Sequence, residues 1–559
     1  MGFCRVFMVF AVFSFLAACM GCGGDEGSIE DIEKDDGGVV VDGADDDESL
    51  DWYEPDPEGR RTEGNLMNED PEMIVITSAE LAPAWEIYAG MRSLQGVHAR
   101  VVDLVEALDG QPGVDDAEKL QSYLRDQVRN NSLRFVLLGG DADVVPFRRI
   151  PAEVTVPTQE TYTTNGPSLL YFANVEVDWD SDGDGVFGQR GKDMSLADAR
   201  ESQLAPGRVP VNHPEEVFAY AAKVEDFLGD VYGRSIHPLL ISDIAASVPI
   251  IGDIDAAEAI EVTFGEFFPD EYKSNVRKLY ATSGAASSFG GEVFTTDLFS
   301  EALGDGYSIV FHQGHGSHGW LTDQVSRDFV KNMTNEQPSI LLSCACLAGN
   351  FADVATTMTH DGWRVQGEGE DSSGELYVVG TRGGVAYVGN TGTGLGPVGG
   401  SQFLHALFEG VFLHSITAIG EAFNYARGRA REIDFSVSLM PDMMDDDTEW
   451  FTQIVVTLLG DPSIDVYTGK PEPLFLDAPL EYGPGYQEMS VDVTCGEGEP
   501  VHGVTVGLWK RGDFFVEAET DEYGRASFSF IPYGPDDLYA GVYGFGFASS
   551  MVIIPAASK

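Results

Sequence analysis

The hydrophobic and polar positions divide the chain into regions of different periodicity. Between residues 71 and 470, short uninterrupted apolar runs alternate with stretches whose apolar residues recur at helical spacing. Runs such as Phe135–Leu138 and Ser339–Ser343 are typical of strands that are buried on both faces of a parallel sheet. Alternating strands and helices of this kind predict an α/β fold, here in two open-sheet halves over residues 71–235 and 236–470. The predicted helices include residues 82–94, 116–129, 214–228, 256–268 and 419–431, and the last predicted strand of this region covers residues 454–459.

After residue 471 the pattern changes to single alternation of apolar and polar positions. Turn signals such as Asp521–Gly524 separate the alternating stretches. Short alternating strands with regular turns predict a small β-sandwich over residues 471–559. The predicted strands are residues 490–493, 503–509, 514–520 and 525–531.

The first 70 residues show neither pattern. An apolar run over residues 6–18 follows Arg5 and is too short to span a membrane, which is typical of a signal peptide. Residues 16–19 (Leu-Ala-Ala-Cys) resemble the lipobox of bacterial lipoproteins, in which the cysteine is lipidated. We therefore expect a signal peptide over residues 1–19 and a lipid anchor at Cys19. The alternatives are a plain secretory signal and cleavage before Cys22. Residues 20–70 are acidic and poor in apolar side chains, and they predict a disordered tether, with a removable propeptide as the alternative.

The charge and the cysteines narrow the class of protein further. A formal net charge of -59 argues against a nucleic-acid partner, because the phosphates would be repelled. The six cysteines are too few and too clustered for the disulfide framework of a secreted domain. Together with the N-terminal pattern, this predicts a protein of the bacterial cell envelope or cell surface, lipid-anchored in the outer membrane, or a secreted protein.

An acidic loop in the first half has the composition of a cation site. Asp178, Asp180, Asp182 and Asp184 alternate with other residues, and glycines lie between and after them. Calcium loops are built this way, because carboxylate oxygens converge on the ion and glycine permits the sharp turn. The glutamate of an EF-hand is absent from the twelfth position. The loop predicts a structural calcium site, with a solvated acidic loop as the alternative, and no organic cofactor is expected.

Reactive side chains follow two predicted strands of the second half. Residues 307–311 run into residues 312–317 (His-Gln-Gly-His-Gly-Ser), and residues 339–343 run into residues 344–351 (Cys-Ala-Cys-Leu-Ala-Gly-Asn-Phe). Catalytic groups of such sheets lie beyond the carboxyl ends of the strands. A histidine base beside a cysteine thiol predicts a cysteine peptidase. The backbone N–H groups of Gly316 and of the nucleophile are the candidate oxyanion donors, each contributing about 3 kcal/mol.

Three other interpretations compete for these side chains. A single cysteine after a strand is usually a packing residue. His312, His315 and His318 recur at every third position, which suggests a zinc site, but an extended glycine loop does not bring this spacing to one ion. Cys344 and Cys346 could form a redox pair, although a disulfide across this spacing is strained.

Six segments in a fixed order add a family resemblance. They are residues 135–146 (Phe-Val-Leu-Leu-Gly-Gly-Asp-Ala-Asp-Val-Val-Pro), the Asp-rich loop 180–188, residues 207–210 (Gly-Arg-Val-Pro), 314–317 (Gly-His-Gly-Ser), 345–351 (Ala-Cys-Leu-Ala-Gly-Asn-Phe) and 459–463 (Leu-Gly-Asp-Pro-Ser). Together they resemble the gingipain-type cysteine peptidases, peptidase family C25 of the caspase-like clan. The resemblance covers residues 71–470 and implies two caspase-like halves, with His315 as the base, Cys346 as the nucleophile and Cys344 as its neighbour. The C-terminal region resembles the immunoglobulin-like domain that follows such catalytic domains.

The resemblance implies an endopeptidase that hydrolyses proteins or peptides through a thioester. In the best-known members, cleavage after arginine or lysine depends on an Asp just ahead of a Tyr. The matching residues 167–171 (Pro-Ser-Leu-Leu-Tyr) contain no Asp, so this basic preference is not implied. Two other functions remain as alternatives: a catalytically inactive cell-surface binding module of the same fold, and a metal-dependent hydrolase that uses the histidine cluster.

Overall fold

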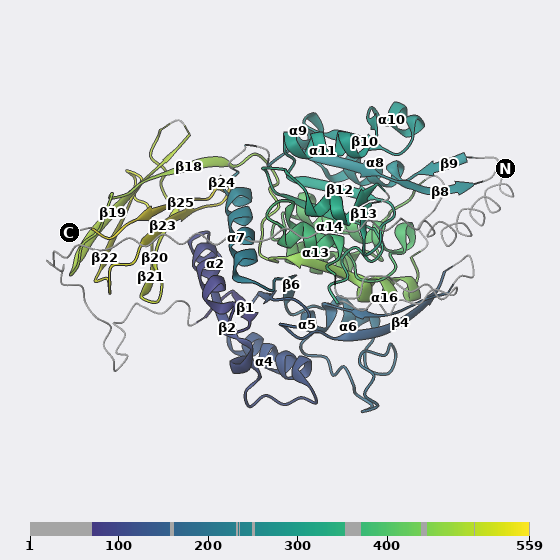
Figure 1. Cartoon of the computed structure of the whole chain (residues 1–559), viewed down its shortest axis with the longest axis horizontal. Helices are drawn as coiled ribbons and strands as arrows, with labels where there is room; N and C mark the ends of the chain where they lie inside the picture. Colours follow the sequence, from purple (N-terminus) through teal and green to yellow (C-terminus); the bar gives the residue numbers. More distant parts are fainter. Residues whose placement is uncertain are drawn as a thin grey trace, which may run out of the picture.

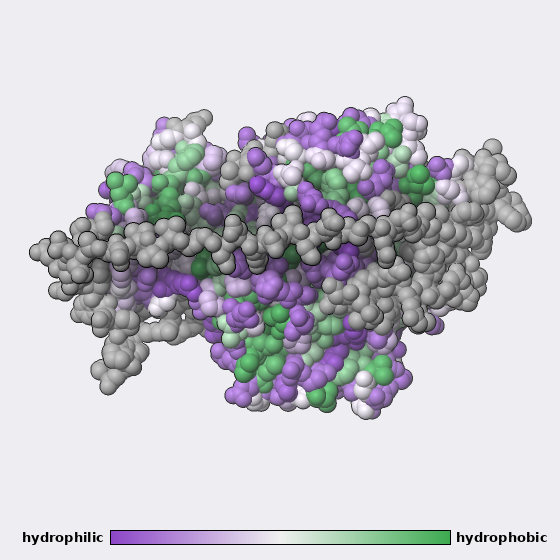
Figure 2. Space-filling view, in the orientation of Figure 1, coloured by the Kyte–Doolittle hydropathy of each residue, from purple (hydrophilic) through white to green (hydrophobic). Residues whose placement is uncertain are grey.

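The computed structural model of the chain describes residues 70–156, 161–230, 233, 235–248, 252–322, 324–352, 370–437, 444–496 and 498–557. A large α/β body and a smaller β body lie side by side along the long axis of the molecule (Figure 1). The predicted signal peptide, the Cys19 anchor and the acidic tether fall outside the described residues. Figure 2 shows hydrophilic residues spread over the described part of one face, with smaller hydrophobic groups between them. Within the described ranges no helix has the length and apolar character needed to cross a membrane.

The predicted first half supplies four parallel strands and the helices that follow them. The helices α2 and α7 have the predicted bounds, because each has an apolar stripe and a proline in its first turn. The sequence pattern missed the β4–β5 hairpin. The elements are β1 Met73–Thr77, α2 Ala82–Leu94, β2 Ala99–Asp103, α3 Leu104–Leu108, α4 Asp116–Asn130, β3 Phe135–Gly139, β4 Arg149–Thr155, β5 Thr161–Pro167, α5 Leu170–Ala173, α6 Leu196–Arg200, β6 Ala205–Val209 and α7 Pro214–Leu228.

The predicted second half continues the same architecture. Its last strand begins at Val456 and not at residue 454 as predicted, because Ile454 still belongs to helix α16. The buried helix α14 was not predicted. The elements are β7 Pro238–Ser242, β8 Ile244–Val248, β9 Gly252–Asp255, α8 Ala257–Phe267, α9 Asp270–Ser274, β10 Arg277–Tyr280, α10 Ser283–Phe289, β11 Glu292–Val293, α11 Thr296–Asp305, β12 Ile309–Gln313, β13 Trp320–Thr322, β14 Val325–Ser326, α12 Arg327–Lys331, β15 Ser339–Ser343, α13 Ser373–Val379, β16 Gly384–Asn390, α14 Gly400–His414, α15 Ile419–Arg429, α16 Asp446–Val455 and β17 Val456–Gly460.

One eleven-stranded sheet runs through both halves. Its strand order is β11-β10-β7-β12-β15-β16-β17-β6-β3-β1-β2. Neighbouring strands are parallel except β16 and β17, which are antiparallel, and β17 also pairs with β6 of the first half. All residues of β12, β15 and β17 are buried, so helices cover both faces of the sheet there. The predicted α/β fold is confirmed, and the two halves share a single sheet.

Two of the six sequence segments fix the junction between the halves. A side chain at Gly207 would collide with the carbonyl oxygen of Gly460, which itself has a φ of +126°. The buried Asp461 carboxylate then pairs with Arg92 of α2 at 3.0 Å and accepts a hydrogen bond from Tyr88 at 2.5 Å. These residues therefore hold β6, β17 and α2 together and lie in the core of the fold.

The C-terminal body is a β-sandwich, as predicted. Its two four-stranded sheets have the orders β22-β19-β18-β24 and β21-β20-β23-β25. Helix α2 separates it from the large sheet (Figure 1), and Gly90 of α2 lies so close to Trp509 that no side chain fits there. The strands are β18 Glu472–Asp477, β19 Gln487–Cys495, β20 Thr505–Lys510, β21 Phe514–Glu519, β22 Arg525–Phe530, β23 Leu538–Tyr543, β24 Phe547–Ala548 and β25 Ser550–Ile554.

Candidate active site

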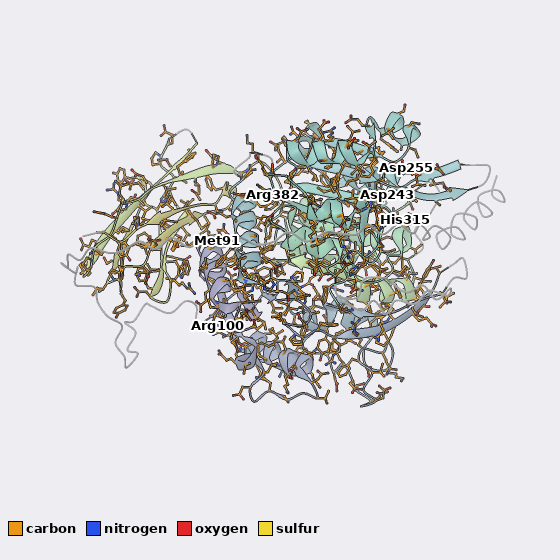
Figure 3. All side chains as sticks on the ribbon, viewed as in Figure 1. Met91, Arg100, Asp243, Asp255, His315 and Arg382 are labelled. Atoms are coloured by element: carbon orange, nitrogen blue, oxygen red, sulfur yellow. The ribbon has the colours of Figure 1, made fainter. Side chains whose placement is uncertain are left out.

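The loop after β12 carries His315 at the edge of the large sheet. The Nε2 atom of His315 lies 3.3 Å from the carbonyl oxygen of Ala245 in β8. A carbonyl oxygen can only accept, so Nε2 carries the proton in the neutral imidazole and Nδ1 keeps its lone pair. Figure 3 labels His315 and Asp243 in the same region of the molecule, and the contact with Ala245 places His315 beside the β8–β9 hairpin. The imidazole is partly buried.

The loop after β15 carries Cys346. Its side chain is 8 % exposed, and Sγ accepts a hydrogen bond from the N–H of Gly394 at 3.3 Å. Leu347 has a φ of +57°, and its N–H donates to the carbonyl oxygen of Gly392 at 2.9 Å. A positive φ is costly for a leucine and persists only where the surroundings impose it. The Gly392–Gly394 loop therefore holds the turn at Cys346 and gives its sulfur a backbone donor.

Asn390, the last residue of β16, is hydrogen-bonded to the backbone of the same turn. Its Nδ2 atom donates to the carbonyl oxygens of Cys344 and Ala345, each at 3.0 Å. The amide is buried, so these bonds are not exchanged for water. The backbone on the N-terminal side of Cys346 is thus fixed by a side chain from the neighbouring strand.

The loops of His315 and Cys346 run against each other. Strands β12 and β15 pair in parallel, with His312 opposite Ser343. Beyond the strands, the N–H of Gly314 donates to Sγ of Cys344 at 3.4 Å. A methyl group at Gly316 would lie 2.7 Å from the Cβ atom of Ala345. The residues on both sides of His315 therefore touch the two residues that precede Cys346.

The two cysteines of this turn are both buried, and each sulfur accepts from the N–H of one glycine and lies within 3.7 Å of the carbonyl oxygen of that same glycine. Burial raises the pKa of the Cys344 thiol to about 12, although the N–H of Gly314 acts in the opposite direction. The thiol of Cys344 lies 3.6 Å from the carbonyl oxygen of Gly314, to which it can donate. Both cysteines are free thiols in the structure. Cys344 is therefore a buried neutral thiol, as expected of a packing residue.

The three nearby histidines do not form a zinc site. Both ring nitrogens of His312 have partners: Nδ1 lies 2.8 Å from Ser343 Oγ, and Nε2 lies 2.9 Å from Asp243 Oδ2. His318 is buried, and its carbonyl oxygen accepts from the N–H of Ser373. Among the described residues, the one group of side chains arranged for a metal is acidic and lies elsewhere.

That acidic group overlaps only in part with the predicted calcium ligands. Asp180, Asp182 and Asp193 place carboxylate oxygens within 4.8 Å of one another, whereas Asp178 and Asp184 are not in the group. Asp184 instead accepts from the side chain of Gln189, at 2.8 and 2.9 Å. The sequence pattern missed Asp193, because the chain returns to the loop after a turn that alternation does not show. The three carboxylates are the residues that could hold a cation here.

Residues 167–171, which match the stretch that carries an Asp in the best-known relatives, are linked to the loop beside Cys346. Residues 168–171 are buried, and the carbonyl oxygen of Pro167 accepts from Thr391 Oγ1 at 2.8 Å. Thr391 precedes the Gly392–Gly394 loop that contacts Cys346. The first half therefore reaches the candidate site through this contact.

Comparisons with known proteins are decisive on the family. The sequence model of peptidase family C25 matches residues 67–467. The chain belongs to peptidase family C25. Membership assigns it the cysteine peptidase fold of that family and protein or peptide substrates as a class. The predicted resemblance is thereby confirmed.

Solved structures agree on the fold. The Arg-specific cysteine proteinase gingipain R has a TM-score of 0.56 at 15% identity, over 89% of this chain and 100% of that one. The complex of RgpB pro- and mature domains from Porphyromonas gingivalis has a TM-score of 0.56 at 16% identity, over 87% of this chain and 100% of that one. The caspase-like architecture of the family C25 chain is confirmed.

A sequence comparison adds one relative. An uncharacterized protein of Archaeoglobus fulgidus is 21% identical over 344 residues, which are 57% of this chain and 75% of that protein.

Several contacts of the site could not be found from the sequence. The carbonyl oxygen of Ala245 has no side-chain signature, and the Gly394 N–H belongs to an ordinary glycine loop. Asn390 ends an apolar run, where a polar residue reads as the end of a strand. Asp243 directly follows the apolar run Leu239–Ile241 and Ser242, and that position was the one available signal.

Proposed function

We propose that this protein is an active cysteine endopeptidase in which Cys346 is the nucleophile and His315 the base. The observation that carries the proposal is the contact between the two loops, with His315 and Cys346 each flanked by residues that touch. The Cys346 thiol gives its proton to Nδ1 of His315, and the thiolate attacks the peptide carbonyl carbon. His315 returns the proton to the leaving amine, a thioester remains, and water hydrolyses it to the acid and the free thiol.

The surroundings of both groups support these roles. The bond from Nε2 of His315 to the Ala245 carbonyl fixes the ring with Nδ1 as the acceptor, and the carbonyl dipole also stabilises the imidazolium that forms. The N–H of Gly394 at Sγ of Cys346 stabilises a developing thiolate. Cys344 also accepts from a glycine N–H, but burial still raises its pKa to about 12 and keeps it a neutral thiol, so we assign it no part in the chemistry.

The proposed oxyanion donors are the backbone N–H groups of Gly316 and Cys346. Gly316 is buried directly against Ala345, and its N–H donates no hydrogen bond to another residue of the described chain. A donor without a partner in the resting enzyme is suited to a charge that appears only in the transition state. Removing one such donor typically costs about 100- to 1,000-fold in kcat.

We propose that cleavage is not restricted to sites after arginine or lysine. Residues 167–171 contain no acidic side chain, and Ser168 is 1 % exposed. A basic P1 side chain would need a carboxylate partner in a closed pocket. The set of cut sites in a mixed peptide library measures this preference directly.

The experiment that tests the function compares wild type, Cys346→Ala and Cys344→Ala on such a library. We expect cleavage by wild type and by Cys344→Ala, and none by Cys346→Ala. Iodoacetamide is expected to block wild type, whereas a metal chelator is not expected to abolish cleavage outright as it would for a metal-dependent hydrolase. Folded wild type that cleaves nothing would overturn the proposal in favour of the non-catalytic binding module.

We also propose that the protein is secreted and lipid-anchored through Cys19. The support is the sequence of residues 16–19 and the acidic segment behind it. Labelled fatty acid is expected in the wild-type protein and not in Cys19→Ser. A Cys19→Ser variant that still carries lipid would contradict the anchor.

A structural calcium ion at Asp180, Asp182 and Asp193 is the remaining proposal. Three hard carboxylates within reach of one ion are the donor type that calcium prefers, and positive φ at Gly183 and Gly185 forms the turn. The ion would offset repulsion among these acidic groups and stabilise the loop, with no part in the peptidase chemistry.

A further inference from the structure

We propose that Asp243, His312 and Ser343 form a buried positioning network that sets the distance between the His315 loop and the Cys346 loop. The inference rests on the proposed function, because it assigns these three residues a role in aligning that base and nucleophile. None of the three touches the substrate in this proposal. They act through the backbone of the two loops.

The network crosses three neighbouring strands at the edge of the sheet that carries the site. β7, β12 and β15 are adjacent, and Asp243, His312 and Ser343 lie at their carboxyl ends. Nε2 of His312 lies 2.9 Å from Asp243, and Nδ1 lies 2.8 Å from Ser343 Oγ. One imidazole therefore adds a side-chain link from β12 to both neighbouring strands, beside their backbone pairing.

The hydrogen bonds of the positioning network run in one direction, from Ser343 through His312 to Asp243. The carboxylate of Asp243 accepts from Nε2–H, which leaves Nδ1 of neutral His312 to accept from the Ser343 hydroxyl. The Ser343 oxygen in turn accepts from the N–H of Ala345 at 3.0 Å. Each hydrogen bond in the network thus has one donor and one acceptor, with a single assignment of protons over the three side chains.

The positioning network contacts both the His315 loop and the Cys346 loop. Ala345, held by Ser343, precedes Cys346 directly and also touches Gly316. On the other side, the N–H of Asp243 donates to the carbonyl oxygen of Gln313 at 3.1 Å. A methyl group at Gly314 would lie 2.6 Å from the Asp243 carboxylate, so this side chain lies against the residue before His315. The network thus ends on the neighbours of the base and of the nucleophile.

The same three residue types form a hydrolytic triad in other enzymes, but burial excludes that role here. His312 is 0 %, Asp243 1 % and Ser343 2 % exposed, so no substrate carbonyl can reach the serine. Burying three polar side chains is costly unless every bond is made in one arrangement. An apolar trio would pack as well, and what the polar trio adds is a single fixed geometry for the strand ends.

The test measures Cys346 reactivity and catalysis in wild type, Ser343→Ala, Ser343→Thr and Ser339→Ala, all as the full chain. Ser339 is the matched control, because it is a buried, hydrogen-bonded serine at the other end of the same strand. Cys346 alkylation by iodoacetamide is followed by peptide mass spectrometry, so that Cys344 and Cys495 are counted separately.

For Ser343→Ala we expect kcat and the Cys346 alkylation rate to fall about 10- to 100-fold, with KM within about twofold of wild type, since misaligned groups lose rate and not binding. Ser343→Thr keeps the hydroxyl and is expected to restore most of both rates. Ser339→Ala is expected to keep both rates. Asp243→Asn, which keeps the size of the side chain without its charge, is the second variant and is expected to lose about tenfold.

Wild-type rates in folded Ser343→Ala and Asp243→Asn would overturn the network, as would an equal loss in Ser339→Ala. If Ser343→Ala does not fold, Ser343→Thr and Asp243→Asn carry the same comparison. The outcomes also separate the two proposals. Wild type that cleaves no peptide while its Cys346 alkylation still depends on Ser343 would refute the peptidase function and keep the network.

Discussion

Gly316 packs against Ala345 so closely that a methyl group at residue 316 would lie 2.7 Å from the Ala345 methyl and 3.0 Å from the carbonyl oxygen of Trp320. The glycine that follows the candidate base is therefore also the point at which its loop touches the loop of the candidate nucleophile. The two loops can lie this close because residue 316 has no side chain.

Gly316→Ala is expected to lower kcat/KM about 100-fold without unfolding the protein, because the two loops must move apart to admit the methyl group. The matched control is Gly319→Ala in the same loop, where an added methyl meets nothing within 4 Å. Peptide cleavage rates and melting temperatures of both variants measure the effect. Equal activity of the two variants would show that the loop contact does not set the geometry.

Cys344 is expected to stay unlabelled when folded protein is treated with iodoacetamide at pH 8. With a pKa of about 12, only about one thiol in ten thousand is ionised at that pH. Peptide mass spectrometry should find Cys346 modified and Cys344 intact, and both modified after denaturation. Equal labelling of the two cysteines in the folded protein would contradict the assignment of Cys344 as a packing residue.

His405 is expected to make the fold sensitive to acid. Burial lowers the pKa of this histidine to about 4, against 6.5 when exposed, although Glu409 and Asp434 act in the opposite direction. Below pH 6.5 the unfolded chain binds a proton at His405 that the folded chain does not bind. The contribution of neutral, buried His405 to the free energy of unfolding is therefore fully present above pH 6.5 and is lost as the pH falls towards 4. The loss amounts to about 3 kcal/mol in the free energy of unfolding.

The variant that tests this is His405→Asn, whose side chain can still bond to Thr263, the partner of Nδ1 at 2.9 Å. Its free energy of unfolding by denaturant should change less between pH 6.5 and pH 4 than that of wild type. His414→Gln removes an exposed histidine and should follow wild type. A His405→Asn variant with the full wild-type loss would place the acid sensitivity in other groups.

Calcium is expected to raise the free energy of unfolding by about 2.7 kcal/mol at a hundredfold excess over Kd, and the melting temperature should rise accordingly. The increase should be lost in Asp193→Asn and kept in Asp178→Asn, because Asp193 belongs to the acidic group and Asp178 does not. Calorimetry with and without a chelator measures both. A calcium effect that survives in Asp193→Asn would move the site elsewhere.

Much of the fold could be predicted because its signals are local. The strand at Ser339–Ser343 and the helix at Pro214–Leu228 have the predicted bounds, since apolar runs and helical spacing reflect the burial of neighbouring residues. The end of α16 at Val455 was missed, because an apolar stretch over residues 454–459 does not show where a buried helix turns into a buried strand. The α14 helix was missed for a related reason: its surface is buried nearly all round, so it lacks a polar face.

The sequence by itself determined the family, the alternation of strands and helices in the large body and the two loops that carry His315 and Cys346. Residue types and short spacings contain that information. Only the tertiary structure decided that the halves share one sheet, that Asp193 joins Asp180 and Asp182, and that Ala245, Asn390 and Gly394 hold the reactive side chains. These are contacts between segments far apart in the chain, several of them made by backbone atoms that every residue possesses, and no side-chain pattern along the sequence can specify them.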